Sequence, residues 1–213
     1  MDAVGIVLAG GQSSRMGVDK AFVDFCGRPL IEHALGILRE AGLPVSIAGS
    51  RPDLKNFAQT IDDLGSFGGP LGGICGALHA SSVPWCVFTP VDLPLIPPSL
   101  IILMREIAHV TGNAVVVPSV NGFVQTFPAV LNRAVLPVLK AELAAGRGGC
   151  FSAFHAAGKV LGHQVHVVAT ELLVQAGQLK HAEGLPVARW FFNINSMADL
   201  ERARTFKRGR VID

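Results

Sequence analysis

Short apolar runs alternate along the chain with longer segments in which apolar residues recur at helical spacing. The runs AVGIVLA (3–9), PVSIAG (44–49) and WCVFTP (85–90) have the length and composition of buried strands. Strands that alternate with helices in this order form parallel sheets covered by helices on both faces. The pattern therefore predicts an α/β fold, with one three-layer domain over residues 1–213 built on a mainly parallel, Rossmann-like sheet.

The same periodicities outline the rest of the chain. Ligands bind beyond the carboxyl ends of parallel strands, so the loops that follow strands are where functional residues are expected. Further strands are predicted at 58–61, 114–118 and 164–168, with an extended segment at 123–131. Helices are predicted from Pro29 to a glycine stop at Gly42, at 71–81, 97–110, 134–146 and 151–157, and from Met197 onward, after a short strand that ends at Asn193 and Asn195.

Composition narrows the classes of function. The 213 residues are 50% hydrophobic and 16% charged, with a formal net charge of +2. This composition is typical of a compact globular protein, and the charge is too small to indicate a nucleic-acid or membrane partner. The chain shows no signal-peptide pattern at its start, and its longest apolar runs are shorter than a membrane span. A cytoplasmic location is therefore expected.

The stretch LAGGQSSRMGVDK (8–20) follows the first predicted strand and concentrates glycine and positive charge. Adjacent glycines let main-chain N–H groups approach a phosphate, and Arg15 and Lys20 add two cationic side chains. The spacing matches neither the GxxxxGK fingerprint of P-loops nor the GxGxxG fingerprint of dinucleotide-binding domains. The residues alone leave two interpretations open, a phosphate-binding loop and a glycine-rich surface turn.

Three later loops combine polar residues with turn signals. DDLGSFGGPLGGI (62–74) by itself predicts no more than an acidic, glycine-rich turn. In TPVDLPLIPP (89–98), Asp92 is a lone charge at the end of the strongest predicted strand. It either caps the next turn or offers the hard oxygen ligand that Mg²⁺ prefers. In FFNINSMADLERA (191–203), a serine followed three residues later by an aspartate is placed to cap the terminal helix.

Together the four stretches resemble a known family. LAGGQSSRMGVDK, followed by GRPLIEHAL, is similar to the signature of nucleotidyltransferases, and its double glycine resembles the molybdenum cofactor guanylyltransferases of the MobA type. An acid before GGPLGGI, the aspartate of VDLP and the segment NIN follow in the family's order. The resemblance covers nearly the whole chain and implies an α/β fold of the nucleotide-diphospho-sugar transferase type.

The resemblance implies roles for matching residues. Leu8 to Gly10 would hold the base through backbone groups. Arg15, Lys20 and Asp92 would be the catalytic residues, the two cations by neutralising the triphosphate and Asp92 as the ligand of Mg²⁺.

Other residues are implied to contact the nucleotide or the acceptor. Asp62 falls at the spacing of the family's nucleotide-contacting aspartate, with Asp63 as the alternative register, and Ser50 stands where family members often have asparagine. Asn193 and Asn195 would lie on the acceptor side. The implied nucleotide-binding set is Leu8, Ala9, Gly10, Gly11, Lys20, Ser50, Asp62, Gly69 and Asp92.

The implied function is transfer of GMP from GTP to the terminal phosphate of the molybdopterin-bound molybdenum cofactor, with release of pyrophosphate. Because a phosphate is itself a nucleophile, the protein would supply positioning and charge neutralisation. GTP and the molybdopterin cofactor are the implied substrates, and cofactor-biosynthesis proteins and apo-molybdoenzymes the implied protein partners. Two alternatives stay open: cytidylyl transfer to the same cofactor or nucleotidyl transfer to a sugar phosphate, and a non-catalytic nucleotide-binding module.

Overall fold

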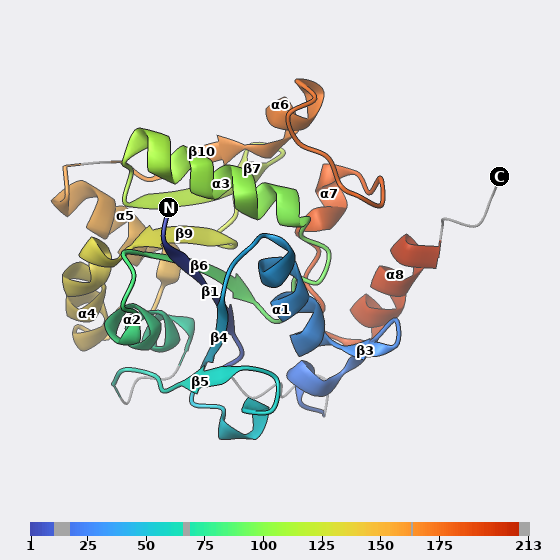
Figure 1. The fold of residues 1–213 in the computed structure, drawn as a ribbon, viewed down its shortest axis with the longest axis horizontal. Helices are drawn as coiled ribbons and strands as arrows, with labels where there is room; N and C mark the ends of the chain where they lie inside the picture. The colour runs from blue at the N-terminus through green and yellow to red at the C-terminus, as the bar shows by residue number, and fades with distance from the viewer. Residues whose placement is uncertain (11–17, 66–68, 163, 209–213) are drawn as a thin grey trace.

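An eight-stranded sheet forms the middle layer of the computed structural model, which describes residues 1–10, 18–65, 69–162 and 164–208 (Figure 1). The strand order is β10-β7-β9-β6-β1-β4-β5, and β8 pairs with β7. The strands are β1 (Ala3–Leu8), β4 (Val45–Ala48), β5 (Gln59–Ile61), β6 (Trp85–Pro90), β7 (Val115–Val120), β8 (Phe123–Val124), β9 (Ala129–Asn132) and β10 (His166–Ala169).

The predicted mainly parallel sheet is confirmed in its central part. β1 runs parallel to β4 and to β6, β4 is parallel to β5, and β10 is parallel to β7. β9 lies antiparallel between β6 and β7, so the sheet is mixed on that side. In register, Leu8 pairs with Ala48 on one side and with Pro90 on the other. The carboxyl ends of β1, β4 and β6 therefore lie at one edge, where a ligand site is expected.

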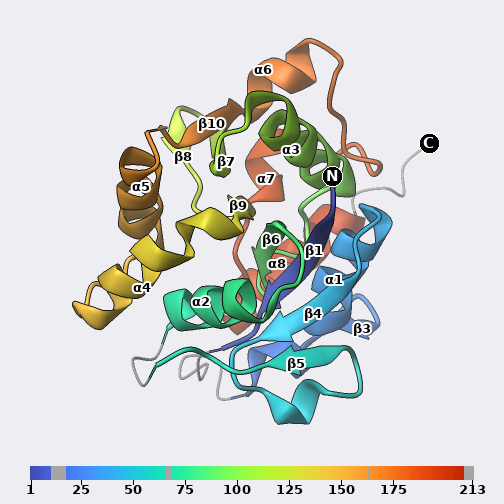
Figure 2. The ribbon, with the colours of Figure 1, turned by 60° about the vertical axis from the view of Figure 1, so that its left-hand side comes forward.

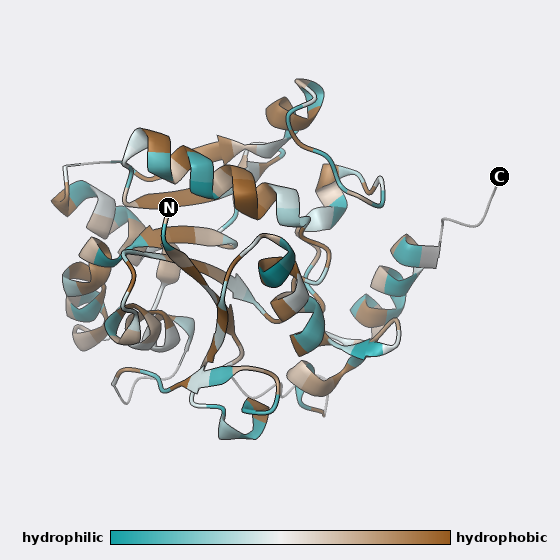
Figure 3. Ribbon diagram, viewed as in Figure 1, coloured by the Kyte–Doolittle hydropathy of each residue, from teal (hydrophilic) through white to brown (hydrophobic). Residues whose placement is uncertain are grey.

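Helices cover both faces of the sheet, as Figure 2 shows with the sheet between the two layers. The helices are α1 (Leu30–Glu40), α2 (Pro70–Ala80), α3 (Pro98–Thr111), α4 (Leu136–Ala144), α5 (Cys150–Val160), α6 (Thr170–Gln175), α7 (Val187–Trp190) and α8 (Met197–Arg208). Alternate residues of β1 explain the layering: Val7 packs in the core cluster of α1 and α3, whereas Ile6 and Leu8 pack in the cluster of α2, α4 and α5. Figure 3 shows the strands β7 and β9 as largely hydrophobic.

The glycines of α2 allow this helix to lie close to the loop that follows β5. A Cβ at Gly76 would overlap the carbonyl oxygen of Asp62. A Cβ at Gly73 would lie 3.2 Å from Oδ1 of Asp63 and 3.5 Å from the Ala48 Cβ. Glycine is unfavourable inside a helix, and here the close approach is what its absent side chain permits.

Several elements differ from the sequence-based expectation. The hairpin of β2 (Asp24–Phe25) and β3 (Arg28–Pro29) was not predicted; its turn needs positive φ at Cys26 (55°) and Gly27 (87°), which a cysteine does not indicate. The helices α6 and α7 and the short 3₁₀ turns were also not predicted. They are η1 (Lys20–Phe22), η2 (Pro52–Leu54) and η3 (Arg133–Val135).

The prediction of a short strand that ends at Asn193 and Asn195 is wrong. Residues 192–195 have no regular secondary structure. They pair with a loop instead of a strand, because the N–H of Ile194 donates to the carbonyl oxygen of Asp92 at 3.0 Å. In the part of the chain that the structure describes, no helix is long and apolar enough to cross a lipid bilayer.

Candidate active site

A pocket of about 400 Å³ opens at the carboxyl ends of β1, β4 and β6. It receives residues from each of the four loop regions that the sequence singled out, together with the loop after β4. Its lining residues are Leu8, Ala9, Gly10, Asp19, Lys20, Ala21, Ala48, Gly49, Asp63, Gly69, Pro70, Gly73, Pro90, Val91, Asp92, Phe127 and Asn193.

The backbone of Leu8 to Gly10 is fixed from both sides. The N–H of Ala9 donates to the Ala48 carbonyl at 2.9 Å, and the Leu8 carbonyl accepts from the N–H of Val91 at 3.1 Å. Gly49 has φ 130°, and a Cβ there would overlap the backbone of Gly10. Only glycine fits at this position, since L side chains rarely adopt such a φ and the backbones approach too closely. The end of β1 is thus a rigid wall of the pocket.

Lys20, which also lines the pocket, joins two distant segments of the chain. Its Nζ donates to Oδ2 of Asp92 at 2.9 Å and to Oδ1 of Asn195 at 2.8 Å. The side chains of Lys20 and Asp92 are 17% and 19% exposed, so the ion pair is shielded but open to the pocket. The catalytic pair implied by the resemblance and one of its asparagines therefore meet in space.

Capping of α8 holds Asn195 in this position. The Ser196 hydroxyl donates to Oδ2 of Asp199 at 2.8 Å and accepts from the Asp199 N–H at 3.1 Å. The same Oδ2 accepts from the N–H of Asn195 at 3.1 Å. The hydrogen bond from Ser196 lowers the pKa of the Asp199 carboxyl. This arrangement is the predicted helix cap, and it also orients the asparagine that accepts from Lys20.

Asp63 is the second carboxylate that lines the pocket from a loop after a strand. Its Oδ1 is buried and has no hydrogen-bond partner among the described residues. Burial, with a smaller contribution from the charge of Asp62, raises the pKa of the Asp63 carboxyl. Its backbone N–H donates to the Ser50 hydroxyl at 2.9 Å. The backbone of Asp63 is thus held by a hydrogen bond, whereas its buried carboxylate oxygen is not satisfied by the described residues, which is a common property of groups that bind ligands.

The charges that line the pocket do not balance. Among the residues that the structure describes, Lys20 is the only cationic side chain in the lining, against the carboxylates of Asp19, Asp63 and Asp92. A polyphosphate bound here would need further positive charge, from a cation or from residues outside the described set. Within the described ranges, no group of three or more His, Cys, Asp or Glu side chains gathers to hold a metal ion. A metal here would have to share its coordination shell with a ligand.

Comparison with known proteins identifies the family of this chain. Residues 5–168 match the family model described as the MobA-like NTP transferase domain. The chain belongs to the MobA-like NTP transferase domain family. The resemblance inferred from the sequence is therefore confirmed.

Two relatives and one solved structure show how similar this chain is to known proteins. A molybdenum cofactor guanylyltransferase from Photobacterium profundum is 34% identical over 146 residues, which cover 66% of this chain and 74% of that protein. A second, from Xanthomonas euvesicatoria, is 44% identical over 99 residues, or 46% of this chain; the chain spans only 50% of that relative. A crystal structure of molybdopterin-guanine dinucleotide biosynthesis protein A from Archaeoglobus fulgidus shares the fold, with a TM-score of 0.76, 21% identity, and coverage of 96% of this chain and 98% of that one.

Most residues implied by the MobA-like resemblance meet at the pocket, but not all. Ser50 is exposed, and neither it nor Asp62 lines the pocket; Asp63, the alternative register, does. Gly11 and Arg15 lie outside the described residues. The implied residues that line the pocket are Leu8, Ala9, Gly10, Lys20, Gly69, Asp92 and Asn193, and the implied Asn195 contacts Lys20.

Some pocket residues were not singled out from the sequence of this MobA-like domain. Ala48 is the last residue of β4 and Gly49 follows it, so the rule that ligands bind at the carboxyl ends of strands could have found them. Asp19 carried a signal as well, because an aspartate before a short helical turn is a common N-cap. Phe127 gave no such signal, since an aromatic residue in an extended apolar segment fits the core equally well.

Proposed function

We propose that this chain transfers GMP from GTP to the terminal phosphate of the molybdopterin-bound molybdenum cofactor. An oxygen of the acceptor phosphate forms a bond to the α-phosphorus, the bond from that phosphorus to the β-phosphate oxygen breaks, and pyrophosphate leaves with the electron pair. The observation that carries the proposal is the contact of Lys20 with both Asp92 and Asn195 at a pocket that Asp63 also lines, with an oxygen that has no partner among the described residues. The family match and the relatives named guanylyltransferases support it.

Asp63 is the residue that we assign to the nucleoside. A guanine edge presents the N1–H and N2–H₂ donors side by side, and a carboxylate can accept both. The buried Oδ1 of Asp63 has no donor among the described residues, and Gly73 lies so close to it that a Cβ there would come within 3.2 Å. The backbone of Leu8 to Gly10 forms the neighbouring wall. Binding of such a base would satisfy the carboxylate, and it explains why an unpaired acid is kept in the pocket.

Lys20 and Asp92 are assigned to the phosphates. Lys20 moves its ammonium group from Asp92 to the β- and γ-phosphate oxygens when nucleotide binds, which neutralises the charge on the leaving pyrophosphate. Asn195 keeps the lysine oriented during this exchange, because its Oδ1 accepts from the same Nζ. Arg15 is proposed as a second cation for the triphosphate. Asn193, which lines the pocket beside Asp92, is assigned to the acceptor side.

The residues present fit a magnesium ion shared with the triphosphate. Asp92 offers one hard carboxylate ligand, and Mg²⁺ needs only one or two such groups when phosphates and water complete its shell. The excess of carboxylates in the lining also favours a divalent cation. When bound, the ion would polarise phosphate oxygens and offset their negative charge. Asp92 would hold it, and the surrounding protein groups would orient acceptor and nucleotide for in-line attack.

A nucleotide panel tests the proposal. Thermal melts with GTP, CTP, UTP or ATP, each with Mg²⁺, should show selective stabilisation by GTP, because binding to the folded state raises Tm. Pyrophosphate release should then require GTP, Mg²⁺ and molybdenum-loaded molybdopterin together. Selective stabilisation by CTP would contradict the assignment of guanine. Tight GTP binding without pyrophosphate release in the presence of the acceptor would instead identify a non-catalytic binding module.

A further inference from the structure

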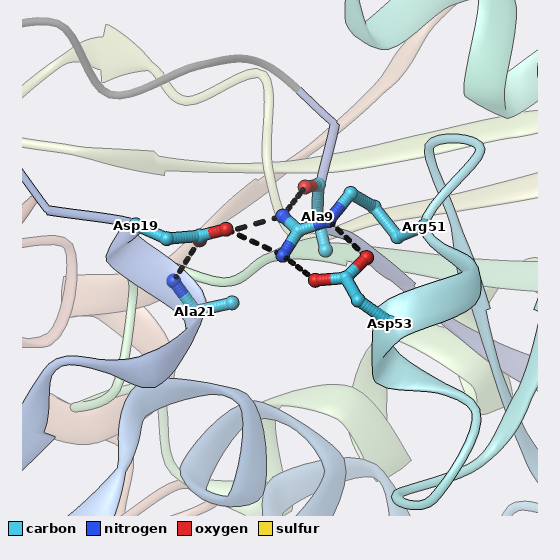
Figure 4. A network of polar contacts seen from close by, with 5 residues as sticks. All are labelled: Ala9, Asp19, Ala21, Arg51 and Asp53. Atoms are coloured by element: carbon cyan, nitrogen blue, oxygen red, sulfur yellow. Dashed lines mark hydrogen bonds and ion pairs between the residues drawn. The ribbon is translucent and has the colours of Figure 1, made fainter.

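Arg51 stands outside the pocket lining, yet it contacts two of its walls (Figure 4). It follows the strand β4, and its side chain is 15% exposed. Its Nη1 donates to the carbonyl oxygen of Ala9 at 3.0 Å. Its Nη2 donates to Oδ2 of Asp19 at 2.6 Å, and Nη1 also donates to Oδ1 of Asp19 at 3.4 Å. One guanidinium group therefore joins the end of β1 to the residue that precedes Lys20.

Each of these two contacts fixes a group beside the assigned nucleotide. Ala9 lies in the backbone wall formed by Leu8 to Gly10, and its carbonyl is held by Arg51 while its N–H is held by Ala48. Asp19 is the N-cap of η1, since its Oδ1 accepts from the N–H of Ala21 at 3.0 Å. Holding Asp19 therefore fixes the start of η1 and, with it, the backbone from which Lys20 reaches Asp92.

The donors of Arg51 are fully used in this network. A guanidinium group has five N–H donors, and the structure gives five hydrogen bonds: two to Asp53, two to Asp19 and one to Ala9. The two carboxylates outweigh the single positive charge of the arginine. Arg51 therefore has neither a spare donor nor excess charge for a phosphate, which distinguishes it from Lys20.

We infer that Arg51 is a positioning residue, which sets the distance between the backbone that holds the base and the lysine that contacts the phosphates. The inference rests on the proposed function only for the names of the ligand's parts. Its geometric content is that the Ala9 carbonyl and the Asp19 carboxylate are fixed relative to each other by one planar, forked group. A lysine cannot replace it, because an ammonium group is a point charge that lacks the fork.

Arg51→Lys is the direct test, with Arg105→Lys as the matched control. Arg105 also donates from Nη1 to a backbone carbonyl, that of Ala41 at 2.8 Å, but it does not line the pocket. We expect Arg51→Lys to lower kcat for pyrophosphate release by about 10- to 100-fold, since a small misplacement of reacting groups has effects of this size. The GTP KM should rise by about 2- to 5-fold, because the base and phosphate contacts remain but their spacing is no longer fixed. Arg105→Lys should match the wild type.

Two further measurements separate positioning from general destabilisation. Millimolar guanidinium should restore part of the kcat of Arg51→Ala, because the small cation can occupy the same fork, and it should leave Arg105→Lys unchanged. Asp19→Asn keeps the capping oxygen but loses its charge, and its effect on kcat should not add to that of Arg51→Lys, because both variants break one contact. Thermal melts of each variant report on folding.

The outcomes are separable from those of the proposed function. If the wild type uses another nucleotide or acceptor, the guanylyl assignment fails. The kcat values of the same variants are then measured on the substrate that the wild type does use. If the wild type turns over no substrate, the nucleotide affinities of the variants are compared instead. A wild-type kcat for Arg51→Lys, or in the binding assay a wild-type affinity, would overturn the inference. An equal loss in Arg105→Lys, or no rescue of Arg51→Ala by guanidinium, would also overturn it, since either result indicates destabilisation rather than positioning.

Discussion

Asp92 and Asp63 line the same pocket from loops after two strands, but their surroundings are opposite. Asp92 is paired with Lys20, which is itself oriented by Asn195. Asp63 has a buried oxygen with no partner among the described residues, and burial raises the pKa of its carboxyl. The charge of Asp92 is compensated by Lys20, whereas the half-buried carboxylate of Asp63 is partly removed from water with no compensation from the described residues.

Under the proposed function, this difference corresponds to two different tasks of the carboxylates. A group that exchanges one cation for another can remain paired at all times, so Asp92 need not lower the stability of the folded state. A group that recognises a neutral donor edge must stay unpaired until the ligand arrives, and the cost is a less stable ligand-free protein. Binding energy recovers that cost. The two aspartates should therefore respond in opposite ways when each is replaced.

Replacing Asp92 should have the largest effect. Asp92→Ala removes the assigned metal ligand and the partner of Lys20, so kcat for pyrophosphate release should fall by at least about 10³-fold. The fold should persist, because Asn195 still accepts from Lys20 and the backbone carbonyl of Asp92 still accepts from Ile194. Steady-state kinetics over a range of Mg²⁺ concentrations, together with circular dichroism, measure both parts.

Glu142→Ala is the control for this loss of charge. Glu142 forms an ion pair with Arg147 at 2.7 Å, outside the pocket lining. Its removal should leave kcat within about 2-fold of the wild type, since isolated surface ion pairs contribute little. Turnover by Asp92→Ala at a comparable level would contradict the assignment of metal and phosphate to Asp92.

Replacing Asp63 should affect binding more than the chemical step. Asp63→Asn changes a two-oxygen acceptor into one oxygen and one donor, which opposes the two donors of guanine. The Kd for GTP should rise by about 10- to 100-fold, the range for loss of hydrogen bonds to a charged group. Asp62→Asn should change the Kd by less than about 3-fold, because Asp62 does not line the pocket. The reverse ranking, measured by calorimetric titration, would restore Asp62 as the nucleotide contact.

The same Asp63→Asn variant should stabilise the ligand-free protein. Removing an unpaired, half-buried charge should raise Tm by about 1–3 °C at neutral pH. The sign follows from linkage: a raised folded-state pKa means that the folded protein is favoured below the ordinary value of 3.8 and loses this advantage as pH rises through the raised pKa. The gain in Tm should therefore be largest at neutral pH and shrink as pH falls toward 4. A gain that is constant with pH, or equal to that of the exposed Asp2→Asn, would contradict this account.

The sequence predicted the central framework better than its connections. β6 has the predicted bounds, Trp85–Pro90, because an apolar run between turn residues can only be a buried strand in this pattern. The hairpin at Cys26 and Gly27 was missed because positive φ at a cysteine has no signature in composition. The segment around Asn193 was predicted as a strand from its apolar residues, but its backbone pairs with the Asp92 loop.

The site was predictable as a set of loops but not as a set of contacts. Lys20 and Asn195 are 175 positions apart, and only the resemblance to a family suggested that they share a site. Asp62 and Asp63 are adjacent and chemically identical, so local sequence cannot tell which side chain faces the pocket. The packing of α2 decides it, because Gly73 lies against Asp63 while Gly76 lies against the backbone of Asp62.

Ser50 offers the smallest test of the same comparison, because it holds Asp63 without lining the pocket. Ser50→Ala removes the hydroxyl that accepts from the Asp63 N–H, and the Kd for GTP should rise by about 2- to 5-fold, the effect of one exposed hydrogen bond. Ser50→Thr keeps the hydroxyl and should bind more tightly than Ser50→Ala. Ser50→Gly also loses the hydroxyl but relaxes the positive φ of 51°, so its Tm should exceed that of Ser50→Ala while its GTP affinity stays equally weak. Equal affinity for all four proteins would show that Asp63 is positioned by α2 alone.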